Sequence, residues 1–133
     1  MRGLLLTCLS ILLLAAACSG SGTAKDVASS LRITVWPEGQ AAGKPVERWR
    51  LSCNPLGGSV PHGDRACYLL ATLSRPFAPV PPDVACAQVY GGPQVAHVVG
   101  SVRGRRVDAT FRRTDGCQIA RWNRVDFLFP KRP

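Results

Sequence analysis

The chain has 133 residues, with 17 lysines and arginines against 8 aspartates and glutamates, so its formal net charge is +9. This length predicts one ordinary domain, and 46% hydrophobic with 19% charged residues argues against a wholly disordered chain. Two histidines, His62 and His97, are too few for a three-histidine zinc site and leave little material for histidine-dependent catalysis.

The N-terminus has the pattern of a secretory signal peptide. Arg2 supplies a positive charge, and residues 4–18 are almost entirely apolar. This stretch is shorter than the ~20 residues that a membrane-spanning helix needs, which disfavours an uncleaved anchor. Small residues, Ala15-Ala16-Ala17, precede the expected cleavage, so we assign residues 1–17 to the signal peptide.

Cys18 leaves two interpretations of the exported form. Leu14-Ala15-Ala16-Ala17-Cys18 resembles a bacterial lipoprotein processing box, with Ala15 in place of the usual leucine, and Cys18 would be the lipidated residue. The alternative is ordinary secretion with an incidental cysteine. Residues 18–30 are small and polar for almost their whole length, which predicts a flexible linker. We expect a secreted protein whose membrane contact, at the outer face of the bacterial membrane, is confined to a lipid anchor on Cys18.

The remaining four cysteines indicate disulfides. In an exported domain they suggest two bonds, for which three pairings exist, and spacing alone does not choose among them. None of them forms a Cys-x-x-Cys motif, which disfavours thioredoxin-type redox chemistry and compact zinc knuckles. We therefore expect neither a metal nor a cofactor. The four are Cys53, Cys67, Cys86 and Cys117.

The folded domain is expected to span residues 31–133 and to begin with two strands. Apolar residues alternate with polar ones at 31–35 and again at 48–53, which is typical of half-buried strands. Residues 39–45 between them predict a turn, and the proline- and glycine-rich residues 54–63 predict a loop.

A short helix is expected next. Asp64 is placed to cap its first turn. The apolar residues that follow share one helical face; they are Ala66, Leu69, Leu70 and Leu73. Residues 75–83 contain four prolines, which exclude a helix interior and predict an extended loop.

The C-terminal half predicts further strands. Residues 95–99 are apolar, Gly100 and Gly104 bracket an expected turn, and alternation recurs at 106–111 and 125–129. The total is about five strands with one or two short helices. This pattern predicts an α+β fold with a five-stranded antiparallel sheet and two disulfides.

No catalytic constellation can be assembled from the sequence. There is no Gly-x-Ser-x-Gly motif, His62 lies in a loop of prolines and glycines, and His97 lies within a predicted strand. We therefore expect a protein that is not an enzyme and has no catalytic residues.

Arginines crowd the C-terminal third of the chain. A nucleic-acid-binding protein would combine such charge with exposed aromatic residues, and Trp122 alone lies among the arginines without an obvious core role. A solvated face is favoured over nucleic-acid binding, and attraction to an acidic protein or envelope polymer is the remaining use of the charge. The arginines are Arg103, Arg105, Arg106, Arg112, Arg113, Arg121 and Arg124.

The segment after Cys86 suggests a function. If Cys86 is bridged to Cys117, the disulfide anchors one side of Ala87-Gln88-Val89-Tyr90, and Pro93 restricts the other. A rigid, exposed, extended segment fits a protease cleft by backbone pairing, and its preorganisation lowers the entropy cost of binding. After attack on the peptide bond, the held ends would reseal at a high effective concentration. The alternative is an ordinary disulfide-linked loop.

Short motifs in a fixed order point the same way. They are Leu51-Ser52-Cys53-Asn54-Pro55, Ala66-Cys67, Cys86-Ala87-Gln88-Val89-Tyr90, Thr110-Phe111 before Cys117, and Val125-Asp126-Phe127-Leu128-Phe129. With these cysteine spacings, residues 31–129 resemble the Streptomyces subtilisin inhibitor family. The resemblance implies a five-stranded antiparallel sheet with two helices, a homodimer, and tight inhibition of subtilisin-like serine proteases. It also implies the disulfides Cys53–Cys67 and Cys86–Cys117.

The resemblance also implies a reactive site. Gln88–Val89 would be the scissile bond, with Gln88 in the primary specificity pocket of the protease. The supporting residues would be Cys86, Ala87, Tyr90, Pro93 and Cys117.

The chain departs from that family at several positions. Gln88 stands where methionine, lysine or arginine is usual, and Tyr90-Gly91-Gly92-Pro93 is one residue longer and more flexible than the family's Tyr-x-Pro. Asp115 replaces an asparagine two residues before the last cysteine. The alternative function is a non-inhibitory module that binds the cell envelope through its arginine-rich face.

Overall fold

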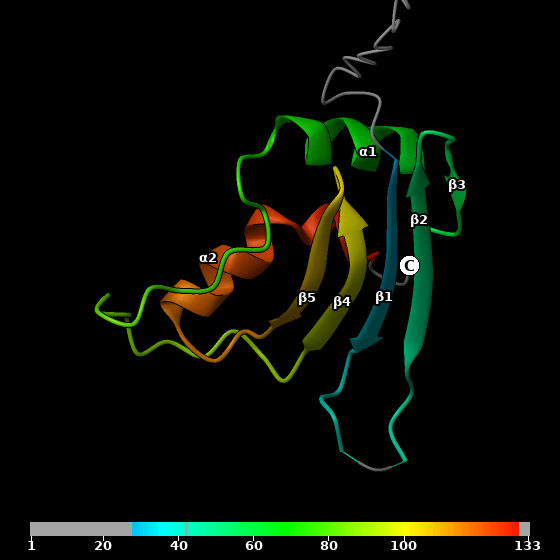
Figure 1. Ribbon diagram of the computed structural model, residues 1–133. Helices are drawn as coiled ribbons and strands as arrows, with labels where there is room; N and C mark the ends of the chain where they lie inside the picture. Colours follow the sequence, from blue (N-terminus) through cyan, green and yellow to red (C-terminus); the bar gives the residue numbers. More distant parts are fainter. Residues whose placement is uncertain (1–27, 42, 131–133) are drawn as a thin grey trace, which may run out of the picture.

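The computed structural model describes residues 28–41 and 43–130. It contains one five-stranded antiparallel sheet with strand order β3-β2-β1-β4-β5, accompanied by two α-helices and a short 3₁₀ helix (Figure 1). This confirms the predicted α+β fold. The strands are β1 (Ser29–Trp36), β2 (Glu47–Cys53), β3 (Gly57–Gly58), β4 (Val95–Val102) and β5 (Arg105–Phe111). The helices are α1 (Gly63–Thr72), α2 (Gly116–Arg124) and the 3₁₀ helix η1 (Asp126–Leu128).

Part of the predicted organisation falls on other residues. The signal peptide, Cys18 and most of the linker lie outside the described residues, and β1 starts at Ser29, two residues before the expected start of the domain. Among the described residues, no helix combines the length and apolarity that crossing a bilayer requires.

The core lies against one face of the sheet. In the central strand β1, Leu31, Ile33 and Val35 are buried while Arg32 between them is exposed, as the alternation predicts. The buried residues of both helices belong to the same cluster as these strand residues, so α1 and α2 cover the same face. The helices contribute Ala66, Leu70 and Trp122.

The predicted strand at 125–129 is wrong. Helix α2 ends at Arg124, and η1 follows it directly. Phe129 packs against two rings, with its centroid 4.6 Å from that of Trp122 and 5.4 Å from that of Phe111. The apolar residues of this segment therefore fill the space between α2 and the sheet instead of pairing with a strand.

The fifth strand is β3, inside the segment predicted to be only a loop. It consists of two glycines and pairs with Leu51 and Ser52 of β2. A Cβ on Gly58 would lie 2.1 Å from the carbonyl oxygen of Arg50, so only glycine permits this pairing. A two-residue strand of glycines has no hydrophobic alternation, and this is why the sequence pattern did not predict it.

Two local predictions also need correction. The N-cap of α1 is His62, which has φ 53° and makes no side-chain capping hydrogen bond, whereas Asp64 lies within the first turn. There its negative charge is close to the positive end of the helix dipole. The turn between β4 and β5 is formed by Arg103 and Gly104, while Gly100 lies inside β4.

Candidate functional site

The candidate site is the segment 84–90, which forms neither helix nor strand and is exposed except at Cys86. Of the five exposed large hydrophobic side chains in the described chain, three lie here: Val84 at 48%, Val89 at 51% and Tyr90 at 70% exposure. Gln88 is exposed as well. Exposed apolar side chains gathered in one segment are typical of a surface that contacts a partner.

The segment is fixed to residues 113–117 on both sides of the Gln88–Val89 bond. On one side, Cys86 forms a disulfide with Cys117, and the amide of Gly116 donates to the carbonyl of Ala87 at 2.9 Å. On the other side, the amide of Gly91 donates to the carbonyl of Arg113 at 2.7 Å. The disulfide is the one that the family resemblance implies, as is the Cys53–Cys67 bond that joins the end of β2 to α1.

Gln88 lies at the apex of a three-residue turn. The amide of Val89 donates to the carbonyl of Ala87 at 2.9 Å, the spacing of a γ-turn centred on Gln88. The Gln88 side chain folds back, and its Nε2 donates to the carbonyl of Cys86 at 3.2 Å. The peptide bond between Gln88 and Val89 is therefore presented on a convex, hydrogen-bonded loop.

Gly91 is an anchor of this loop. A Cβ at this position would lie 2.8 Å from Cδ1 and 2.9 Å from Cγ1 of Ile119, closer than side-chain atoms approach. The sequence suggested only added flexibility at Gly91-Gly92, but the first of these glycines is hydrogen-bonded and packed against α2. The close approach of the backbone to the helix explains why glycine is needed here.

Helix α2 positions the support behind the loop. Asp115 is its N-cap, and its Oδ1 accepts a hydrogen bond from the amide of Gln118 at 2.9 Å. This cap fixes the start of the helix that carries Cys117 and Ile119, both of which contact the loop. The sequence analysis missed α2 and the roles of Arg113, Gly116 and Ile119. An acidic N-cap before a polar-faced helix was the signal available to find it.

The far end of the loop rests on the connection between β1 and β2. Tyr90, Gly92 and Pro93 line a cleft of about 260 Å³ together with Gly39 and other residues. A Cβ on Gly39 would lie 3.3 Å from the carbonyl oxygen of Pro93, so the two segments are in contact. The predicted supporting residues are thus distributed along both ends of the loop.

Four of the seven C-terminal arginines interact with the domain itself. Arg121 donates to the carbonyls of Ala78 at 2.9 Å and Thr110 at 3.2 Å, its guanidinium lies 4.6 Å from the ring centroid of Phe111, and burial lowers its pKa. Arg103 donates to two carbonyls and Arg124 to one. Arg113 lies over the ring of Trp122 at 5.9 Å. These side chains hold loops and helices in place and do not form one free basic face.

The polar clusters of the described residues do not supply a catalytic or metal centre. His97 Nε2 lies 2.8 Å from Asp108 Oδ1 in a surface pair on neighbouring strands β4 and β5. Cys86, Cys117 and Asp115 lie close together, but the two sulfurs are joined in a disulfide and are not thiolate ligands.

Comparison with known proteins gives one similar solved structure to report. No protein-family model and no curated protein matches the chain. The crystal structure of Streptomyces caespitosus sermetstatin in complex with Bacillus licheniformis subtilisin contains a chain that is 24% identical. The match covers 74% of this chain and 96% of that chain, with a TM-score of 0.47. A likeness at this level does not by itself assign a function.

Proposed function

We propose that this protein is an exported inhibitor of subtilisin-like serine proteases that presents the Gln88–Val89 bond as a substrate would. One observation carries the proposal: the bond lies on an exposed loop that is anchored on both sides to residues 113–117. A loop already held in its bound shape loses little conformational entropy when a protease cleft closes around it.

The two anchors also explain how such a loop would resist turnover. Attack at Gln88 would leave the acyl group attached through Cys86 to Cys117, and the new amine of Val89 attached through Gly91 to Arg113. Both ends would stay next to each other at a high effective concentration, so resealing would compete with hydrolysis. An ordinary flexible loop lacks these anchors and is simply cut.

Gln88 sets the class of protease. Its amide is neutral, so it does not form an ion pair with the aspartate at the base of a trypsin-type pocket. A broad apolar pocket accepts an uncharged side chain of this size. We therefore infer a subtilisin-like partner over a trypsin-like one.

The test is a titration of the oxidised protein against subtilisin with a chromogenic peptide, followed by mass spectrometry of the complex. We expect stoichiometric inhibition with cleavage confined to Gln88–Val89. Gln88→Lys should add inhibition of trypsin, since a lysine pairs with the pocket aspartate. Rapid degradation by subtilisin, or no inhibition at all, would contradict the proposal.

Export and assembly belong to the same proposal. Mass spectrometry of the mature N-terminus would distinguish a lipidated Cys18 from ordinary secretion. Sedimentation of the protein would test the homodimer that the family resemblance implies. On the outer face of the sheet Arg32 lies directly opposite Arg50, so a dimer through this face would have to balance their charge.

A further inference from the structure

A cavity of about 590 Å³ lies between the segment after α1 and the turn that joins β4 to β5. It is at the start of β5, whereas the end of β5 leads to residues 113–117 behind the protease-binding loop. The two sites are therefore at opposite ends of that strand (Figure 1). The residues that line the cavity are Ser74, Arg75, Pro76, Phe77, Ala78, Val102, Arg103, Arg105, Arg106 and Val107.

The floor of the cavity is apolar. Pro76, Val102 and Val107 are buried, and Phe77 is half-buried with its ring edge-on to that of Phe111. A volume of this size with an apolar lining and a few polar groups is typical of a site for a small organic ligand.

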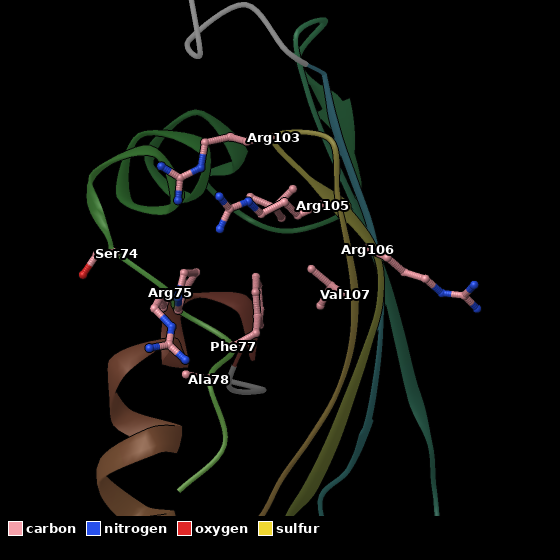
Figure 2. Close-up of a pocket in the computed structure, with 10 residues that line it drawn as sticks. Ser74, Arg75, Phe77, Ala78, Arg103, Arg105, Arg106 and Val107 are labelled. Carbon is pink, nitrogen blue, oxygen red and sulfur yellow. The ribbon is translucent and has the colours of Figure 1, made fainter. Parts of the chain in front are cut away.

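Arginines surround this floor. Figure 2 shows Arg103 and Arg105 extending from the β4–β5 turn towards the segment that carries Arg75. Arg106 extends in the opposite direction, on the other face of the sheet. Three exposed guanidinium groups thus border one apolar hollow.

No carboxylate neutralises these cations within the described part of the chain. Neither aspartate nor glutamate is among the described residues that line the cavity, and Arg75 and Arg105 have no hydrogen-bond or ion-pair partner there. Arg103 is fixed by the carbonyls of Ala71 and Leu73, at 3.4 and 2.9 Å. An anion entering the cavity would relieve the mutual repulsion of these groups.

The backbone adds an independent observation. Arg75 has φ 48° and Arg103 has φ 51°, the left-handed region that residues other than glycine, asparagine and aspartate rarely adopt. Both residues border the cavity from opposite sides. Unfavourable backbone conformations of this kind are concentrated at ligand-binding sites, where they position side chains.

We propose that this cavity binds a small amphiphilic carboxylate. Its apolar body would lie on Phe77 and Val107, and its carboxylate would accept hydrogen bonds from Arg75 and Arg105, whose planar guanidinium groups match carboxylate geometry. This site goes beyond the proposed inhibition and does not depend on it.

The experiment titrates octanoate into the oxidised protein and follows backbone amide signals by NMR. We expect saturable shifts confined to residues 74–78 and 102–107. Arg75→Gly, which suits the positive φ, and Arg105→Gln should each weaken octanoate binding about tenfold, the loss of a charged hydrogen bond. Arg106→Gln removes the same charge on the opposite face and is the matched control, with an expected change under about twofold.

Separate ligands distinguish the contributions. Acetate tests the carboxylate alone and octanol tests the apolar chain alone, and each should bind at least about tenfold more weakly than octanoate. Equal binding of either one would overturn the proposal, as would an equal loss in Arg106→Gln or the absence of saturable shifts. The same variants should inhibit subtilisin like the parent protein, so failure here is distinguishable from failure of the proposed function.

Discussion

Removing the Cys86–Cys117 disulfide is the sharpest test of the braced loop, because the chain supplies a control of matched stability. The two disulfides span 31 and 14 residues of sequence. In the chain-entropy model, loops of these lengths contribute about 3.7 and about 3.0 kcal/mol to the free energy of unfolding. Replacing either pair with serines should therefore destabilise the domain by nearly the same amount.

Only one of the two variants frees the reactive loop. After Cys86→Ser with Cys117→Ser, the acyl side of the loop is held by the Gly116–Ala87 hydrogen bond alone, worth about 1 kcal/mol. We expect subtilisin to cleave Gln88–Val89 in this variant at least about tenfold faster, with release of the fragments, since a loss of about 1.4 kcal/mol corresponds to a factor of ten. Cys53→Ser with Cys67→Ser should remain an inhibitor.

The assay measures inhibition and fragment release over time, at a temperature where circular dichroism shows both variants folded. A parallel loss of inhibition in both variants would mean that overall stability, and not bracing, protects the loop. Unchanged inhibition without the Cys86–Cys117 bond would refute the role of this disulfide.

Three further predictions concern the support behind the loop. Gly91→Ala should weaken subtilisin inhibition about tenfold, because overpacking costs about 1–3 kcal/mol, and adding Ile119→Ala should restore most of it by removing the clashing atoms. Asp115→Ala should lower the free energy of unfolding, measured in urea, by about 1 kcal/mol through loss of the α2 cap; Asp115→Asn, which keeps an acceptor, should not. Arg121→Met should lower it by about 2 kcal/mol, because the carbonyl of Ala78 loses a charged donor; a loss below about 0.5 kcal/mol would contradict this role.

The sequence by itself determined most of the sheet. A strand with one buried face must alternate in polarity, and the stretches at 31–35, 48–53 and 106–111 show that alternation and correspond to β1, β2 and β5. The four cysteines likewise indicated two disulfides, although their spacing allowed three pairings, and the family resemblance supplied the pairing found.

Tertiary structure decided the elements that carry no such pattern. Residues 125–129 alternate like a strand, yet the space between α2 and the sheet turns them into η1, with Phe129 against Trp122 and Phe111. Strand β3 exists because glycine lets the backbone approach Arg50 closely. In both places the outcome depends on residues distant in sequence, which local periodicity does not report.

The same division holds at the candidate site. The residue types and the neighbouring cysteine directed attention to Gln88 and Val89. The bracing itself comes from backbone hydrogen bonds, from Gly116 to Ala87 and from Gly91 to Arg113. Every residue except proline has an amide and every residue has a carbonyl, so these bonds leave no signature in the sequence. Only the fold, by bringing the two segments together, determines that they form.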